Sequence, residues 1–155
     1  MRPISINVVN SLILVLGSLA MPLALADQHQ KDGMDQLISE APADAKVYII
    51  SPQDGDTVGQ TFTVRFGLSG MGVAPAGVDT KGTGHHHLLI DVDKMPDLTK
   101  PLPASDRLIH FGGGQTETEI TLPPGKHTLQ LVMGNYLHIP HKKPVMSKKI
   151  TVTVK

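Results

Sequence analysis

The chain has 155 residues, of which 14 are lysine or arginine, 14 are aspartate or glutamate, eight are histidine and none is cysteine. This length suffices for one domain with a hydrophobic core. The balanced charge gives no electrostatic reason to expect nucleic acid or an anionic membrane as a partner. Without cysteine the chain cannot form disulfides, zinc–thiolate sites, blue-copper centres or a thiol nucleophile.

Residues 1–26 have the pattern of a secretory signal peptide. Arg2 precedes an apolar core over residues 12–20, and Ala24-Leu25-Ala26 supplies the small residues of a cleavage site. A glycine and a proline interrupt the apolar run and no basic cluster follows it, which disfavours a permanent membrane span. We therefore expect cleavage after Ala26 and a soluble protein exported to a bacterial periplasm, without a membrane partner.

Residues 27–45 are polar, and we interpret them as a linker or mobile arm ahead of the domain. Cleavage after Ala26 would create the new terminus Asp27-Gln28-His29. Its amine, two backbone nitrogens and the imidazole of His29 could form the square-planar nitrogen site that copper(II) prefers. This terminus is a candidate metal site of its own, separate from the domain.

From Lys46 onward, short runs of alternating apolar and polar residues are separated by turn residues. This pattern, with no long helical period, predicts an all-β, immunoglobulin-like antiparallel β-sandwich of about seven strands over residues 46–155. The expected strands span residues 47–50, 61–68, 85–92, 108–111, 116–122, 126–133 and 149–155. Their inward faces predict a core of Phe62, Val64, Phe66, Leu88, Ile90, Ile120, Leu129, Leu131, Ile150 and Val152.

Two connections are longer than the fold requires. Residues 67–84 contain six glycines and no strand pattern, and residues 134–146 contain two histidines and two prolines. Loops of this length inside a compact domain are usually functional or disordered, and both connect to strands that bear histidines. Residues 93–107 contain three prolines and cannot form a central strand.

Three consecutive histidines open the third expected strand. Because side chains alternate between the two faces of a strand, His85 and His87 share one face and His86 points to the other. Two imidazoles two residues apart on one face can bind the same metal ion. The alternative interpretation is that each histidine is a polar residue at the start of a buried strand.

The remaining histidines supply further candidate ligands. The set is His85, His87, His110, His138 and His141, with His86, Met71 and Met146 in reserve. Imidazole suits copper, zinc and nickel, so we expect one transition-metal ion, copper or zinc, at one end of the sandwich. His127 shares the inward face of apolar residues and is expected to be structural. Asp91 could orient a metal-bound imidazole, although an exposed strand carboxylate is the commoner role.

Five segments, residues 70–77, 84–91, 110–117, 123–131 and 138–141, together resemble a family of small exported bacterial domains catalogued only as a domain of unknown function. The resemblance covers about residues 46–155. It implies export and these domain limits, and it supplies no ligand or activity. In the family an acidic or proline residue tends to follow the last histidine, where this chain has Lys142-Lys143. Two cations there disfavour a bound cation at His141.

Two other functions stay open on the sequence alone. A sandwich with long loops could be a non-catalytic protein-interaction module of the cell envelope that binds another envelope protein, with structural histidines. Only 3% of the residues are aromatic and none is tryptophan, which disfavours a sugar-stacking surface. A histidine-bound metal with an open position could activate water, but no serine nucleophile or carboxylate pair supports catalysis, so an enzyme is the less favoured class.

Overall fold

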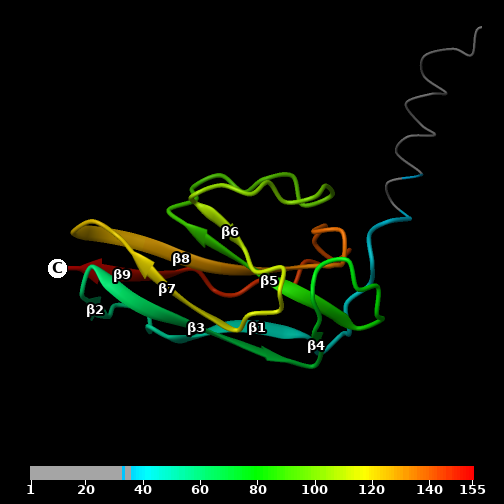
Figure 1. Cartoon of the computed structure of the whole chain (residues 1–155), viewed down its shortest axis with the longest axis horizontal. Helices are drawn as coiled ribbons and strands as arrows, with labels where there is room; N and C mark the ends of the chain where they lie inside the picture. Colours follow the sequence, from blue (N-terminus) through cyan, green and yellow to red (C-terminus); the bar gives the residue numbers. More distant parts are fainter. Residues whose placement is uncertain (1–32, 34–35) are drawn as a thin grey trace, which may run out of the picture.

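The computed structural model describes residue 33 and residues 36–155, and it contains two β-sheets packed face to face (Figure 1). The strands are β1 (Lys46–Ser51), β2 (Thr57–Val58), β3 (Thr61–Ser69), β4 (Gly72–Val73), β5 (Thr83–Ile90), β6 (Leu108–His110), β7 (Glu117–Thr121), β8 (Gly125–Gly134) and β9 (Ile150–Val154). The predicted signal peptide and the Asp27-Gln28-His29 terminus lie outside the described residues. Within those residues, no helix has the length and apolar character needed to cross a membrane.

The smaller sheet contains three antiparallel strands in the order β1-β3-β7. The larger sheet has the order β2-β9-β8-β5-β4, and β6 also pairs with β5. Its main pairings, β5 with β8 and β8 with β9, are antiparallel, whereas the two-residue strands β2 and β4 pair in parallel with their neighbours. The predicted all-β sandwich is therefore confirmed, with short parallel additions at the edges of the larger sheet.

All seven predicted strands are present, as β1, β3, β5, β6, β7, β8 and β9. Strands β2 and β4 were not predicted, because a two-residue strand is too short to show an alternating pattern. Strand β4 falls inside residues 67–84, where no strand was expected, and β3 continues into the same segment as far as Ser69. Strand β5 also begins within this segment, at Thr83, so that expectation was wrong.

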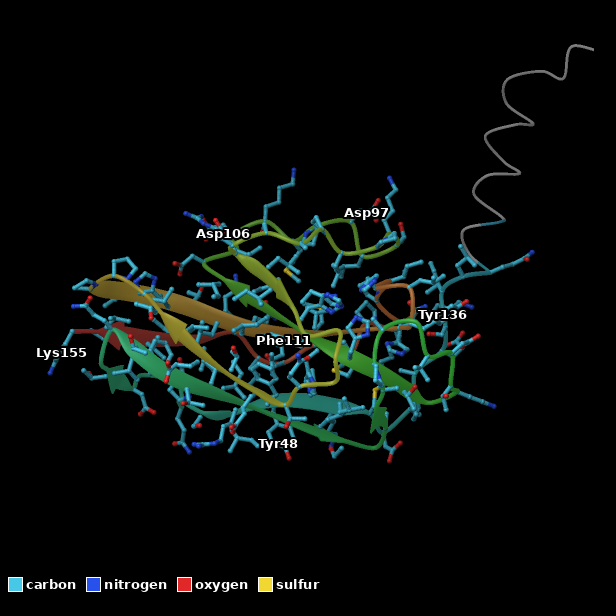
Figure 2. All side chains as sticks on the ribbon, viewed as in Figure 1. Tyr48, Asp97, Asp106, Phe111, Tyr136 and Lys155 are labelled. Atoms are coloured by element: carbon cyan, nitrogen blue, oxygen red, sulfur yellow. The ribbon has the colours of Figure 1, made fainter. Side chains whose placement is uncertain are left out.

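The core lies between the two sheets. Eight of the ten predicted core residues are buried there, and the other two, Phe62 and Ile150, are half-buried against the same cluster. The cluster also includes Val47, Phe111, Met133 and Val145. Phe111 comes directly after β6 and lies near the middle of the fold, where Figure 2 labels it.

A second apolar cluster covers the outer face of the larger sheet. Leu89 of β5 and Val132 of β8 are buried there beneath Leu102 and Leu108. The segment between β5 and β6 passes over this face in Figure 1. Because both faces of the sheet are covered, β5 is buried along almost its whole length. Polar side chains on its outer face are consequently held away from bulk water.

Phe66→Ala should lower the free energy of unfolding by about 3–5 kcal/mol, because it leaves a cavity in the core. The Phe66 side chain is 4% exposed, and its ring centroid lies 4.8 Å from that of Phe111. Chemical denaturation measures the effect. Glu119→Ala, at an exposed position of β7, is the matched control and should cost less than about 1 kcal/mol. An equally small loss for Phe66→Ala would show that the core has been misassigned.

Candidate metal centre

The three histidines of β5 are all buried but face two different environments. The His86 ring lies between the sheets, with its centroid 5.1 Å from that of Phe66. His85 and His87 point to the outer face of the larger sheet, the face that also carries Leu89. The predicted alternation is therefore correct. Strand β5 is an inner strand of its sheet and presents His85 and His87 on the sheet's covered outer face.

His85 and His87 form a cluster with His110 at the end of β6 and His138 in the loop after β8. One donor nitrogen from each residue lies within 4.8 Å of the other three. His85 Nε2 and His138 Nδ1 are 3.2 Å apart. Donors around a tetrahedral zinc ion lie about 3.3 Å from one another, given nitrogen–metal distances of about 2.0 Å. Small side-chain rotations would therefore bring all four nitrogens onto one ion.

The pairing of β6 with β5 positions His110. In this antiparallel pair His110 is directly opposite His87, so both side chains emerge on the same face of the sheet. Their ring centroids are 5.2 Å apart. A side chain on Gly112 would collide with the His110 ring, and a Cβ on Gly134 would lie only 2.6 Å from His87 Cε1. These two glycines leave space for the imidazoles of His110 and His87. This role was not predicted from the sequence.

His141 is the one predicted ligand that the structure does not bring into the cluster. The loop after β8 turns back on itself because Gly134 and Pro140 form an antiparallel bridge. This turn buries His141 beside Gly84, where an added Cβ would lie 3.1 Å from His141 Cε1. Of the two histidines predicted as ligands in this loop, only His138 joins the cluster, and His141 packs beside Gly84.

The reserve ligands pack among apolar side chains. His86 is in the sandwich core, and Met71 packs against that same core. Met146 packs against the apolar cluster on the outer face of the larger sheet. The methionines therefore fill gaps between apolar side chains, the commoner role of this residue.

Several buried nitrogens of the cluster have no hydrogen-bond partner among the described residues: His85 Nδ1, both ring nitrogens of His87, and His110 Nε2. Buried polar atoms are normally paired, because an unpaired one loses its hydration without compensation. A metal ion would give some of these nitrogens a partner. Both ring nitrogens of His86 are equally without a partner in the described part of the chain, and an ion in the cluster would not explain them.

His85, His87 and His110 are neutral near pH 7. Burial, with repulsion by the neighbouring imidazoles as the smaller cause, lowers the pKa of His85 to about 4 and that of His87 to about 3. Burial likewise lowers the pKa of His110. Neutral imidazole is the form that coordinates metals, so these donors need not release a proton to bind an ion at neutral pH.

Comparison with known proteins shows the family. The model of the domain of unknown function DUF4399 matches residues 64–155. The chain belongs to this family. The DUF4399 match begins within β3 and includes all four histidines of the cluster. The family description names no ligand.

Outside DUF4399 the comparisons add little. No curated protein matches the chain. Among solved structures, the chain is similar to the endo-β-1,4-mannanase from Thermotoga petrophila, with 18% identity and a TM-score of 0.45 over 75% of this chain and 21% of that one. The chain thus spans about a fifth of that enzyme's length. A likeness this weak says nothing about function.

Asn135 holds the loop that carries His138 and links it to residues upstream of the DUF4399 match. Its Oδ1 accepts hydrogen bonds from the backbone N–H groups of Leu137 and Ile139, at 2.9 and 3.1 Å. Its Nδ2 donates to the carbonyl oxygen of Leu37 at 2.8 Å. The adjoining part of the arm is thus attached to the domain, whereas its composition alone indicated a mobile segment. An asparagine directly after a strand-ending glycine is a turn signal that could have identified this residue.

Asn135→Ala should destabilise the domain by about 1–3 kcal/mol, because the buried backbone donor of Ile139 and the part-buried donor of Leu137 lose their acceptor. Asn135→Asp keeps an acceptor for both donors but sets a buried carboxylate oxygen against the Leu37 carbonyl oxygen, so it should also destabilise the domain. Chemical denaturation of both DUF4399 variants gives the comparison. Equal stability of Asn135→Ala and the parent protein would show that the loop does not depend on this side chain.

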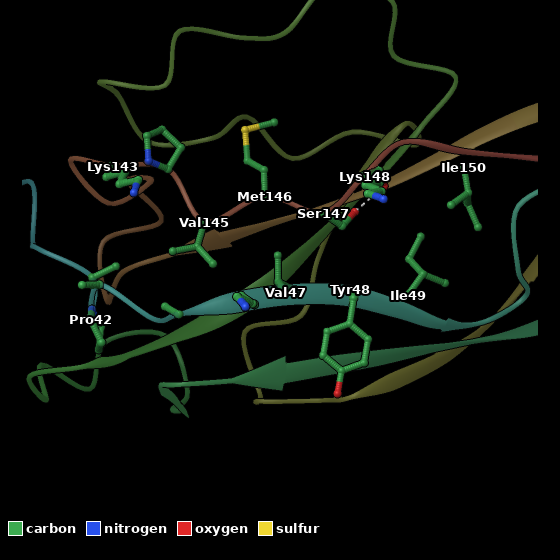
Figure 3. A pocket seen from close by; sticks show the side chains of 15 residues that line it. Pro42, Val47, Tyr48, Ile49, Lys143, Val145, Met146, Ser147, Lys148 and Ile150 are labelled. Carbon is green, nitrogen blue, oxygen red and sulfur yellow. Dashed lines mark hydrogen bonds between the residues drawn. The ribbon is translucent and has the colours of Figure 1, made fainter.

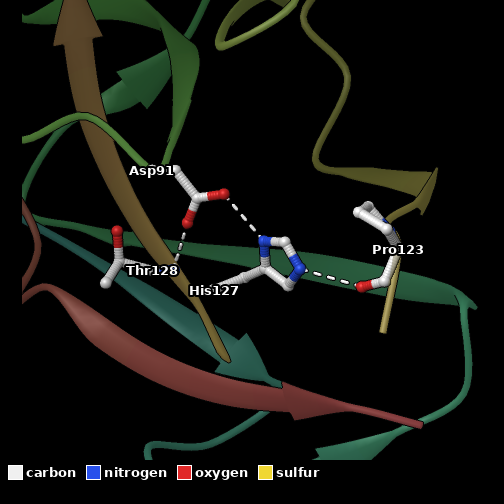
Figure 4. A network of polar contacts seen from close by, with 4 residues as sticks. All are labelled: Asp91, Pro123, His127 and Thr128. Atoms are coloured by element: carbon white, nitrogen blue, oxygen red, sulfur yellow. Dashed lines mark hydrogen bonds and ion pairs between the residues drawn. The ribbon is translucent and has the colours of Figure 1, made fainter. Parts of the chain in front are cut away.

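His127 has a structural role in the DUF4399 domain, as the sequence indicated (Figure 4). Its Nδ1 donates to Asp91 Oδ2 at 2.7 Å, and its Nε2 donates to the carbonyl oxygen of Pro123 at 2.9 Å. Both ring nitrogens face acceptors, and the bond to Asp91 raises the pKa of His127. Asp91 also accepts a bond from the backbone N–H of Thr128 at 2.8 Å. It therefore orients His127 and is not a partner of the metal-ligand candidates.

Proposed function

We propose that this domain binds one transition-metal ion, copper or zinc, in the bacterial periplasm. The ligands are His85, His87, His110 and His138. The observation that carries the proposal is the convergence of four imidazoles, from β5, β6 and the loop after β8, with donor nitrogens within 4.8 Å of one another. Imidazole is a ligand that zinc and copper share.

The composition of the cluster supports this choice of metals. The group of candidate donors in the described part of the chain contains histidines and no carboxylate. Calcium and magnesium require oxygen ligands, so a cluster of nitrogens alone disfavours both ions. The chain also contains no cysteine, so no thiolate competes for a soft metal.

The number of ligands favours binding over catalysis. Four protein ligands complete a tetrahedral zinc site, whereas a catalytic site keeps one position open for water or substrate. His85 and His87 are 0% and 1% exposed, while His110 and His138 are half-buried. An ion would therefore enter from solvent past the half-buried pair and reach the buried pair last. These features suit holding, storing or delivering an ion.

Calorimetric titration of the mature protein with Zn²⁺ and Cu²⁺ tests the proposal. The protein should carry His29→Ala, because the Asp27-Gln28-His29 terminus could bind Cu²⁺ independently. We expect one ion per chain with a Kd below about 10 μM, or roughly −7 kcal/mol. Mg²⁺ is the negative control. Weaker binding of both transition metals would overturn the proposal and leave the histidines as structural residues.

The proposed compartment rests on residues 1–26 and has its own test. Export with cleavage after Ala26 should give a periplasmic protein whose first residue is Asp27. Terminal sequencing of protein released from the periplasm measures this. A chain that keeps Met1 and stays with the membrane fraction would contradict both the cleavage site and the compartment.

A further inference from the structure

An apolar groove of about 450 Å³ lies along the outer edge of β1 (Figure 3). Strand β1 is the edge strand of the smaller sheet, paired with β3 on one side only. The facing wall is formed by residues 143–150, and Pro42 contributes to the lining beside the start of β1. This facing wall belongs to the larger sheet, since Val145 O accepts from Met133 N at 3.0 Å and Ser147 N donates to Leu131 O at 2.9 Å. The groove is thus the open side of the sandwich.

The backbone of β1 is available to another strand. Its register with β3 is regular from Lys46 to Ile49 and shifts only between Ile49 and Ser51. In an antiparallel pair, alternate residues direct their N–H and C=O groups away from the partner strand. Within the described residues, no hydrogen bond joins the backbone of this stretch to the facing wall. Such an edge is a template for the addition of an extended peptide.

Apolar side chains lie between the two walls. Val47 and Val145 are buried, and Ile49 and Ile150 are half-buried. A strand added to β1 would place alternate side chains over this apolar surface and the others toward the rim. The ring of Tyr48 points away from the facing wall in Figure 3, so the groove has no aromatic stacking surface for a sugar.

The rim of the groove is positively charged on both sides. Lys46 lies on β1, and Lys143 and Lys148 lie on the facing wall. No acidic residue lines the groove, and none of these three lysines forms an ion pair with a described residue. The neighbouring Lys142, by contrast, is paired with Glu40 at 3.3 Å. Three cations without an ion-pair partner among the described residues, placed around an apolar strip, favour an occupant that alternates carboxylates with apolar side chains.

We propose that this groove binds an extended acidic peptide segment of a partner protein. The segment adds a strand to β1, covers Ile49 and Ile150 with its apolar side chains, and places its carboxylates beside the lysines of the rim. A second copy of the domain is a poorer occupant, because pairing two β1 edges would bring two sets of lysines together. This interaction is separate from metal binding and does not depend on it.

Fluorescence anisotropy with a labelled peptide of alternating valine and glutamate, seven residues long, tests the inference. The peptide should bind the full mature chain with a Kd below about 1 mM, and binding should weaken with salt. Reversing Lys143 and Lys148 together to glutamate should weaken binding at least about tenfold. Reversing the exposed Lys126 and Lys155, which lie outside the groove, should change it less than about twofold.

Two further measurements identify the mode of binding. Two adjacent prolines at the centre of the peptide remove a backbone donor that faces β1 in either register, so they should abolish binding if the peptide adds a strand. Amide NMR shifts on peptide addition should be confined to β1 and residues 143–150. Three results would overturn the inference. They are an equal loss of peptide affinity in the Lys143/Lys148 and Lys126/Lys155 variants, binding of the proline peptide, and amide NMR shifts outside β1 and residues 143–150. A β1-mediated dimer in sedimentation experiments without peptide would overturn it in favour of self-association.

Discussion

Alanine at both His85 and His87 should lower the affinity for the metal ion by about a thousandfold or more, equal to roughly 4 kcal/mol. These two donors are the most deeply buried members of the cluster, and they are held on a strand that cannot move without disturbing its sheet. The two remaining ligands would have to complete the coordination shell with water. Calorimetry with Zn²⁺ and Cu²⁺ in the His29→Ala background measures the loss.

Two single substitutions are matched controls for this double variant. His127→Ala removes a histidine that is bonded to Asp91 and Pro123 and should leave metal affinity within about twofold. His141→Ala removes a buried histidine that lies next to β5 but outside the cluster, which makes it the stricter control. A loss of affinity for His141→Ala as large as for the double variant would show that the ligand set has been assigned wrongly. Circular dichroism should confirm that every variant stays folded.

The metal-free domain should lose several kcal/mol of stability between pH 6.5 and pH 4. Burial lowers the pKa of His86 to about 4 from its ordinary value of 6.5, and it lowers the pKa values of His85 and His87 as far or further. The unfolded chain therefore takes up protons at a pH where the folded chain does not. For His86 alone, the shift of the pKa from 6.5 to about 4 corresponds to a loss of roughly 3 kcal/mol in the free energy of unfolding, at about 1.36 kcal/mol for each pKa unit.

The sign of this effect is specific to buried neutral histidines. When folding lowers the pKa of a histidine, the free energy of unfolding has its full value above pH 6.5. It decreases as the pH falls from 6.5 toward the pKa of that histidine in the folded state. His127, with its raised pKa, acts in the opposite direction and stabilises the fold below pH 6.5. Domains of this size have a total stability of about 5–15 kcal/mol. The proton uptake of the three β5 histidines on unfolding should therefore be enough to unfold the domain in acid.

Urea denaturation at a series of pH values, with a chelator present, measures this loss. His86→Leu should flatten the profile, and at pH 7 it should raise the free energy of unfolding by about 1–3 kcal/mol, because it removes two buried unpaired nitrogens at similar volume. Thr63→Leu, an exchange at a partly exposed position of β3, controls for a general gain from an apolar residue. Stability that stays constant from pH 7 to pH 4.5 would contradict the assignment of these histidines as buried and neutral.

The parts of the site that could be predicted from sequence depend on local geometry. Alternation along β5 assigns His85 and His87 to one face and His86 to the other without knowledge of any other strand. The position of His110 depends instead on which strand β6 pairs with and in which register, and neither is encoded within three residues. Chemistry suggested His110 as a ligand, but only the fold could place it opposite His87.

The loop after β8 shows why irregular segments resist prediction. His138 and His141 are three residues apart and were equally good candidates, since a loop has no side-chain period. The bonds of Asn135 and the bridge between Gly134 and Pro140 decide which of the two reaches the cluster. The cover over the outer face of the larger sheet was also missed, because the sequence shows only that residues 93–107 cannot form a central strand.

The alternation of the three β5 histidines makes the proposed site sensitive to errors in strand pairing. A slip of one residue between β5 and β8 would turn His85 and His87 into the apolar core and leave only His86 on the outer face. Such a chain would have one β5 histidine on the outer face in place of two and could not assemble the four-nitrogen cluster. The stoichiometry of bound metal would therefore report the fraction of molecules with the correct β5 register, a misfolding error that composition, mass and overall strand content do not reveal.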